Sequence, residues 1–310
     1  MRACFLAMTV LMAACAPEGW NTLEKLVEQD AEVKTVESGL EFTFLEGPAW
    51  HPAIGLVFSD IPANAIYRLA SGGGITLFRE QSNGSNGLMF DHAGSLVMCE
   101  GGAGRITSME PGGEISVVAD SFRGMPFNSP NDLVIDARNG IYFTDPRFGG
   151  DADLPQDAQA VYYRHPDGQI TRTIDDVEKP NGIILSPDGG RLYVADSSEP
   201  LIHAYKVSET GLPVDAFVFA VLKETERGAD GLTVDERGNL YVTSSVGVQL
   251  FNDKGHYLGT IEVPEVPANV TFGESDLKTL YITARRHLYT LRMRVRGVVF
   301  PLGAKPSGAL

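Results

Sequence analysis

Short apolar runs alternate with polar turns along this chain, and the pattern repeats about every 39 to 50 residues. Each repeat opens with a Glu, Asp or Asn and continues into an apolar run, a turn rich in Asp, Asn, Ser and Gly, and an alternating strand. We call the opening residues the lead residues; they are Glu46, Asn86, Asn131, Asn181, Asp230 and Asn269. Short β-rich runs joined by such turns predict β-hairpins.

A third strand can be read in every repeat and a fourth in five of them, as at residues 65–69 and 75–78 of the first. Four strands per unit at this period predict an all-β fold, a six-bladed β-propeller with four-stranded antiparallel blades. The sixth repeat has no fourth strand of its own. We expect residues 33–44 to supply it, because closing the ring removes free sheet edges.

The lead residues stand at the same phase of each repeat, at one end of the strand that lines the central channel of a propeller. Each carries a side-chain oxygen, so we expect six oxygens near one axis at the channel mouth. The alternative for any single lead residue is an ordinary turn, because Asn and Asp before Gly are frequent turn formers.

A ring of carboxylate and amide oxygens without Cys or His suits a hard cation such as calcium or magnesium. Glu46 and Asp230 would supply two negative charges, and Asn131 and Asn181 neutral oxygens. Water would fill the other positions and could be activated there. Asp132 and Asp230 are then candidates for the catalytic base that takes a proton from this water.

The composition excludes several other classes of function. The net charge is −15, and no basic footprint for nucleic acid is visible. The predicted domain contains one cysteine, Cys99, which excludes a disulfide framework, and no Cys/His cluster has zinc spacing. The sequence has no Gly-x-Ser-x-Gly, His-Glu-x-x-His or phosphate-loop motif, and none of the six histidines is a lead residue.

The N-terminus is predicted to be an export signal. One arginine, Arg2, precedes an apolar run that ends in Ala13, Ala14 and Cys15. These three residues resemble the bacterial lipobox, which implies lipidation of Cys15 and a periplasmic or outer-membrane lipoprotein. The alternatives are ordinary secretion with cleavage near Ala16, or a misread start. The expected boundaries are residues 1–15 for the signal, 16–32 for a tether, 33–300 for the propeller and 301–310 for a tail.

Several ordered motifs between about residues 41 and 284 resemble the SMP-30/gluconolactonase/LRE-like family. They lie at residues 46–50, 130–132, 142–146, 179–182, 186–189, 229–231 and 238–241. The resemblance implies a six-bladed propeller with a divalent cation in its channel, usually calcium but also zinc, magnesium or manganese. It also implies hydrolysis of a small-molecule lactone.

The resemblance assigns roles to individual residues. Glu46, Asn181 and Asp230 are implied as metal ligands, and Asn131 as a further ligand or a substrate contact. Asp132 is implied as a supporting acid, and Asp230 as the general base.

The second blade and the third lead residue bear on the substrate. Asn86 and Glu100 are candidate substrate contacts. The chain has Ser129 where sugar-lactone members often carry Arg, and Gly101 where many bacterial members carry His. These departures bring a sugar substrate into question more than the metal or the fold, and leave a smaller or less polar lactone open.

The favoured hypothesis is therefore a calcium-dependent lactone hydrolase. Two alternatives remain: an organophosphate hydrolase at the same metal, and a non-catalytic binding propeller with structural calcium. No protein partner is evident, and membrane contact is expected only through a lipid on Cys15. Residues 147–159 form a long insertion that we expect over the channel mouth, as a lid or a solvated loop.

Overall fold

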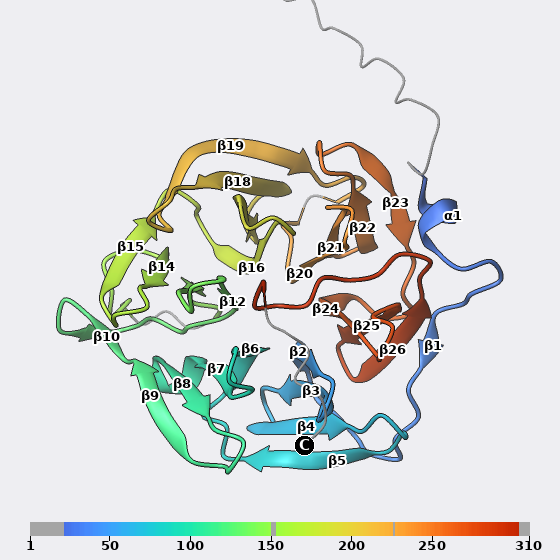
Figure 1. The fold of residues 1–310 in the computed structure, drawn as a ribbon, viewed down its shortest axis with the longest axis horizontal. Coiled ribbons are helices and arrows are strands. Elements are labelled where there is room, and N and C mark those ends of the chain that lie inside the picture. The colour runs from blue at the N-terminus through green and yellow to red at the C-terminus, as the bar shows by residue number, and fades with distance from the viewer. Residues whose placement is uncertain (1–21, 150–152, 226, 304–310) are drawn as a thin grey trace, which may run out of the picture.

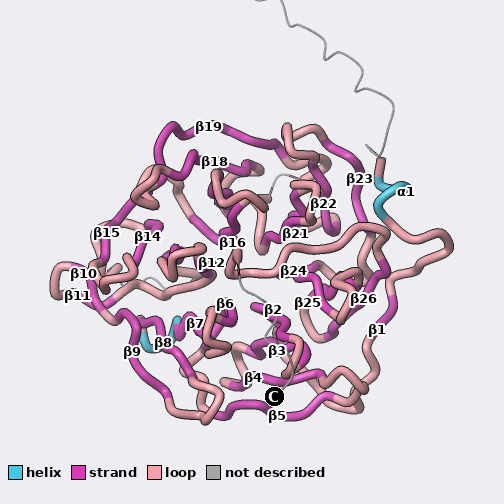
Figure 2. The backbone as a smooth tube through the Cα atoms, in the orientation of Figure 1, coloured by secondary structure: helices cyan, strands magenta, loops and turns pink. Residues whose placement is uncertain are grey.

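A computed structural model describes residues 22–149, 153–225 and 227–303 of the chain. These residues form six four-stranded antiparallel sheets arranged around a central axis, which is a six-bladed β-propeller (Figure 1). Strands and connecting loops make up nearly all of the tube, with short helical turns at α1 (Leu23–Leu26) and η1 (Gly101–Ala103) (Figure 2). The predicted fold class is confirmed.

The first five blades each use four consecutive strands, and a small hairpin lies between blades 2 and 3. Blade 1 contains β2 (Leu45–His51), β3 (Gly55–Asp60), β4 (Ala65–Leu69) and β5 (Ile75–Glu80). Blade 2 contains β6 (Ser85–Phe90), β7 (Leu96–Glu100), β8 (Arg105–Met109) and β9 (Ile115–Ala119). The hairpin consists of β10 (Ser121–Phe122) and β11 (Met125–Pro126). Blade 3 contains β12 (Leu133–Ile135), β13 (Ile141–Asp145), β14 (Ala160–Arg164) and β15 (Ile170–Ile174). Blade 4 contains β16 (Pro180–Leu185), β17 (Arg191–Asp196), β18 (Leu201–Val207) and β19 (Pro213–Val221). Blade 5 contains β20 (Leu232–Val234), β21 (Leu240–Ser244), β22 (Gly247–Phe251) and β23 (Tyr257–Ile261).

Blade 6 is built from both ends of the described chain. It contains β24 (Pro267–Gly273), β25 (Thr279–Ala284) and β26 (His287–Arg292), and its outer strand is β1 (Lys34–Thr35). Lys34 pairs with Thr290 and Thr35 with Tyr289 in antiparallel register. This pairing confirms the predicted closure of the ring by the N-terminal segment.

The chain packs on the propeller earlier than the predicted tether boundary. Leu26 is fully buried in one hydrophobic cluster with Tyr241 and Leu250 of blade 5, and Val27 bridges Met293. Cys15 and the predicted signal lie outside the described residues. Within the described part of the chain, no helix has the length and apolarity needed to cross a membrane.

The second strand of a blade is buried along its length, because its two faces pack against neighbouring blades. All five residues of β13 are buried, whereas most of the outer strand β9 is exposed. Large aromatic side chains fill the space between blades, including the buried Tyr142, Tyr163 and Tyr193. This packing explains why the central strands read as nearly continuous apolar runs.

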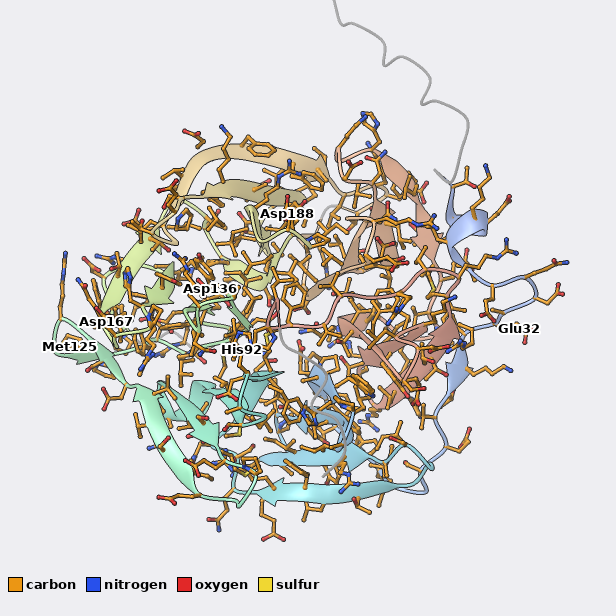
Figure 3. The ribbon with its side chains drawn as sticks, viewed as in Figure 1. Glu32, His92, Met125, Asp136, Asp167 and Asp188 are labelled. Carbon is orange, nitrogen blue, oxygen red and sulfur yellow. The ribbon has the colours of Figure 1, made fainter. Side chains whose placement is uncertain are left out.

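The C-terminal segment crosses the centre of one face of the ring, where it is dark red in Figure 1. The Glu236 amide donates to the Arg296 carbonyl at 2.8 Å, and Val298 donates to Val234 at 3.3 Å. His92 and Asp136 lie nearby, on turns that follow first strands (Figure 3). Residues 298–300 line the inner end of the channel, so they close this end and leave the end with the lead residues as the mouth.

Candidate functional site

The lead residues are aimed by local irregularities in the innermost strands. Glu46, Asn86 and Asn181 are each the second residue of their strand, and the register with the next strand shifts directly at these positions. Such a bulge redirects a side chain out of the regular alternation. Asn131 and Asp230 instead stand just before β12 and β20.

The glycines after the lead residues allow neighbouring blades to meet. Gly87 donates its amide to the Asn131 carbonyl at 2.7 Å, and Gly182 donates to the Asp230 carbonyl at 3.2 Å. A Cβ atom on Gly182 would lie 2.3 Å from the Asp230 carbonyl oxygen, which no side chain tolerates. These two Asn-Gly pairs are therefore contacts between blades, and not the turns that they could have been from sequence alone.

Five lead residues converge on a cavity of about 310 Å³ at the channel mouth. Its polar wall consists of Glu46, Asn86, Ser129, Asn131, Asn181 and Asp230. The sixth lead residue, Asn269, lies deeper and lines a separate inner cavity of about 70 Å³. The structure thus brings together all four residues predicted to bind a metal.

A directed chain of hydrogen bonds links three of the lead residues. Asn86 Nδ2 donates to Asn131 Oδ1 at 2.7 Å, and Asn131 Nδ2 donates to Asn181 Oδ1 at 2.5 Å. Asn181 Nδ2 then donates to Ser197 Oγ at 2.9 Å, and this hydroxyl donates to the Ala229 carbonyl at 2.9 Å. A carbonyl can only accept, so the Ala229 carbonyl sets the direction of the whole chain and hence the orientation of each amide.

Glu46 and Asp230 form an electrostatically strained pair in this cavity. Burial raises the pKa of Glu46 to about 7, against hydrogen bonds from the Gly47 amide, at 2.9 Å, and from Asn269. The pKa of Asp230 is raised well above its ordinary value, first by burial and then by the charge of Glu46. Two carboxylates with so little compensating positive charge favour a bound proton or a bound cation.

The donor set fits a hard cation. Glu46 and Asp230 would hold it with their carboxylates, and Asn131 and Asn181 would add amide oxygens that each accept one hydrogen bond already. Among the described residues, no group of three or more His, Cys, Asp and Glu side chains is arranged to hold a metal. Oxygen ligands with only two charges suit calcium better than zinc, which prefers nitrogen and sulfur ligands.

Asp132 lies outside the cavity at the mouth and lines the inner cavity instead. Its Oδ1 accepts the Leu133 amide at 2.9 Å, and its pKa is raised to about 7, mainly by burial. The charge of Glu46 contributes to this shift, so the two carboxylates influence each other. A substrate in the mouth would not reach Asp132, which makes its predicted role as catalytic base a poor match to its position.

Glu100 also lies outside the cavity. Its carboxylate binds Arg79 at 2.6 Å and Arg105 at 2.7 Å, and it accepts further hydrogen bonds from Asn83 and Thr107. Although burial raises its pKa, these hydrogen bonds, led by the one from Arg105, leave the pKa lowered overall. The structure corrects the prediction of a substrate contact, because the carboxylate of this fully buried residue is surrounded by partners inside its own part of the ring.

Glu100 belongs to a set of acids at the end of second strands whose common position was not recognised from the sequence. Asp60, Asp145 and Asp196 hold the same place in blades 1, 3 and 4. Asp145 accepts the amides of Asn128 and Ser129 at 2.9 and 2.8 Å, and so fixes the segment that precedes Asn131. The signal in the sequence was their constant position within the repeat.

The family model described as the SMP-30/Gluconolactonase/LRE-like region matches residues 44–286 of this chain. A gluconolactonase of Zymomonas mobilis is 29% identical over 305 residues, which cover 89% of this chain and 85% of that protein. A solved structure of a gluconolactonase from Xanthomonas campestris is 31% identical, with a TM-score of 0.79 over 88% of this chain and 92% of that one.

A calcium-binding protein, a regucalcin from Agrobacterium tumefaciens, has the same fold at lower identity. It is 21% identical with a TM-score of 0.76, and the match covers 88% of this chain and 97% of that one. At this identity the likeness concerns the fold alone.

Proposed function

The chain belongs to the SMP-30/gluconolactonase/LRE-like family, and on that premise we propose that it hydrolyses lactones with a calcium ion at the channel mouth. The observation that carries the proposal is the convergence of Glu46, Asn131, Asn181 and Asp230 on one cavity. The gluconolactonase relatives support the reaction class, since two of them match most of the chain.

The reaction adds water to the carbonyl carbon of the lactone, breaks the ring C–O bond and releases a hydroxy acid. A bound divalent cation polarises a carbonyl oxygen and lowers the pKa of bound water. Asp230 is partly exposed to the cavity, so its carboxylate is in a suitable position to accept the proton of the attacking water. That proton then passes to the alkoxide that leaves when the ring opens.

The asparagines at the mouth would bind the substrate and the cation and hold them in position. The amide of Asn86 is partly exposed at the mouth, where it can contact the ring oxygen or a substituent of the substrate. Asn131 and Asn181 are held by the hydrogen-bond chain that ends at the Ala229 carbonyl, so their oxygens need no reorientation when a ligand binds. Such preorganisation reduces the cost of binding.

The test is a lactone panel assayed with added calcium and with a chelator, on the parent chain and on Asp230→Asn. We expect chelation to abolish turnover and Asp230→Asn to lower kcat by about 10³-fold, in the range found when a key electrostatic group is removed. Asp253→Asn, an exposed acid of blade 5, is the matched control and should keep full activity. Normal turnover by Asp230→Asn would refute the proposal.

The same panel separates the two alternatives. Turnover of phosphotriesters but not lactones would favour the organophosphate hydrolase. A loss of thermal stability on chelation, without turnover of any substrate, would favour a binding protein with structural calcium.

We further propose that the mature protein starts at Cys15 and is anchored by a lipid on that residue in the bacterial periplasm or outer membrane. The support is the sequence pattern before Cys15. It agrees with the position of α1 at the periphery of the ring, away from the central channel (Figure 1). Mass spectrometry of the mature N-terminus tests it, and an unmodified N-terminus after residue 15 would exclude the anchor.

A further inference from the structure

We infer that the preferred substrates are lactones with an apolar alkyl or aryl substituent, and not the polyhydroxylated lactones of sugars. The inference rests on the proposed function, since it names the substrate class of the same cavity. It comes from the part of the wall that the lead residues do not form.

Apart from the lead residues and Ser129, the wall of the cavity is apolar. Its side chains are those of Phe44, Ile61, Pro130 and Phe148, and Gly84 and Gly101 add none. Apart from the lead residues, Ser129 is the one polar side chain among the described residues of this wall. A substituent that projects from a lactone bound at the lead residues would therefore lie against carbon.

Phe44 is a fixed part of this wall. Asp60 accepts the amide of Phe44 at 3.1 Å, and Ile61 donates its own amide to the Phe44 carbonyl at 3.2 Å. The Arg285 guanidinium lies over the Phe44 ring, 5.2 Å from its centroid. These contacts hold the ring and Ile61 in place before any substrate arrives.

Phe148 is the exposed part of the wall. Its side chain is 49% exposed, and the Lys179 ammonium lies 5.3 Å from the ring centroid. The preceding residue is tied down, because Gln159 Oε1 accepts the Arg147 amide at 2.8 Å. An apolar substituent would remove this ring from water, which is the contribution that drives hydrophobic binding.

The glycine at position 101 keeps the wall free of a further side chain. A Cβ atom there would lie 2.7 Å from Ser129 Oγ and 3.2 Å from the Pro130 carbonyl. Neither Arg285 nor Lys179 lines the cavity. Beyond the lead residues, the hydroxyl groups of a sugar would thus find one polar side chain, Ser129, and a site discriminates in favour of hydroxyl groups only when it provides their partners.

The experiment compares three δ-lactones: one unsubstituted, one with a five-carbon side chain and glucono-1,5-lactone. We expect kcat/KM to be at least tenfold higher for the alkyl lactone than for the glucono-lactone. Phe148→Ala should raise KM for the alkyl lactone about tenfold at constant kcat, and leave the unsubstituted lactone within twofold. Phe148→Leu should restore most of the loss.

Phe217→Ala is the matched control. Phe217 resembles Phe148, because its side chain is 41% exposed and the Arg191 guanidinium lies over its ring, 5.7 Å from the centroid. It differs in position, since it lies on the outer strand of blade 4. Its removal should change no kinetic constant. Because Asp230→Asn should turn over slowly, binding of the lactones to this variant provides a second readout, and the alkyl lactone should bind it more tightly than the glucono-lactone.

The outcomes separate this inference from the proposed function. If the glucono-lactone is preferred, or if Phe148→Ala affects the three lactones equally, the inference is overturned while lactone hydrolysis stands. If no lactone is turned over, the proposed function fails and the inference fails with it.

Discussion

Two glutamates with little solvent exposure, Glu46 and Glu100, differ in what compensates their charge. Glu100, at the end of β7, has two arginines, an asparagine and a threonine around its carboxylate, and its pKa is lowered. Glu46, near the start of β2, has the Gly47 amide and Asn269, and burial raises its pKa to about 7. Of the two, Glu46 is the one that faces the cavity at the mouth.

The difference separates structural acids from functional ones. A buried carboxylate whose charge is fully compensated by neighbouring side chains contributes to the fold. A buried carboxylate that lacks compensating charge and faces a cavity is incomplete without a proton, a cation or a ligand, and such groups concentrate at functional sites. The contrast also explains why Glu100 was misjudged from sequence, since its partners come from segments on both sides of β7.

The largest effect is expected from Glu100→Gln, which tests the structural half of the contrast. The Arg79 side chain is 10% exposed, so the loss of its anion leaves a nearly buried cation poorly paired. We expect the free energy of unfolding to fall by about 3 kcal/mol, measured by urea denaturation. Calcium affinity should stay within twofold. The control is Glu110→Gln, at an exposed turn of the same blade, which should leave the free energy of unfolding unchanged. An unchanged free energy of unfolding in Glu100→Gln would show that its ion pairs do not stabilise the fold.

The second effect is a pH dependence of the calcium-free protein. Because the pKa of Glu46 rises from 4.5 to about 7 on folding, the folded state retains protons that the unfolded state has lost. The contribution of this proton to the free energy of unfolding is fully present at pH 4 and is lost as the pH rises through 7. For Glu46 alone the loss is about 3 kcal/mol. Denaturation with chelator at pH 5 and pH 8 measures it, and calcium should raise Tm more at pH 8. Equal stability at both values would contradict the raised pKa.

Glu46→Gln should weaken calcium binding about 30-fold, or about 2 kcal/mol, because half of the ligand charge is removed. The calcium-free variant at pH 8 should be at least as stable as the parent, since a neutral amide replaces an uncompensated charge. Isothermal titration calorimetry gives the affinity. Glu41→Gln, at an exposed position before β2, should bind calcium like the parent. Unchanged affinity in Glu46→Gln would require a different ligand set.

The smallest effect is expected from Ser197→Ala. It removes the acceptor of Asn181 Nδ2 and frees the amide chain from the Ala229 carbonyl. We expect calcium affinity to fall about fivefold, close to 1 kcal/mol, which is typical of one hydrogen bond. Ser197→Thr keeps a hydroxyl and should restore binding, while Ser198→Ala should have no effect. A full-affinity Ser197→Ala would show that the amides hold their orientation without it.

The fold was largely predictable because its signals are local and repeated. The expected strand at residues 65–69 coincides with β4, and the expected strand at residues 75–78 lies within β5. Closure by the N-terminal segment followed from one missing strand. The early packing of Leu26 was not predictable, since one leucine in a polar stretch does not show which surface will bury it.

The site was predictable only in part. The phase of the repeat identified Glu46, Asn131, Asn181 and Asp230, which do meet in one cavity. The phase describes the lead residues and not their neighbours. Asp132, one residue on, belongs to the inner cavity, because neighbouring residues on an extended backbone point in opposite directions. Phe44 and Phe148 reach the mouth from connecting segments, whose course no periodic pattern specifies.

The pairing of β1 with β26 has a consequence for the order of assembly. Lys34 and Thr290, which pair in this sheet, are 256 positions apart in the chain. The strand β1 is synthesised first and can pair only after β26, the last strand, has been synthesised. Contacts of such separation slow folding, because the entropy of closing a long loop must be lost before they form. This pairing lies within blade 6. Glu46 belongs to blade 1, on one side of blade 6, and Asp230 leads blade 5, on the other side. A cation bound by both Glu46 and Asp230 would therefore connect the two blades that flank blade 6, and would stabilise the closure of the ring by the beginning and the end of the chain.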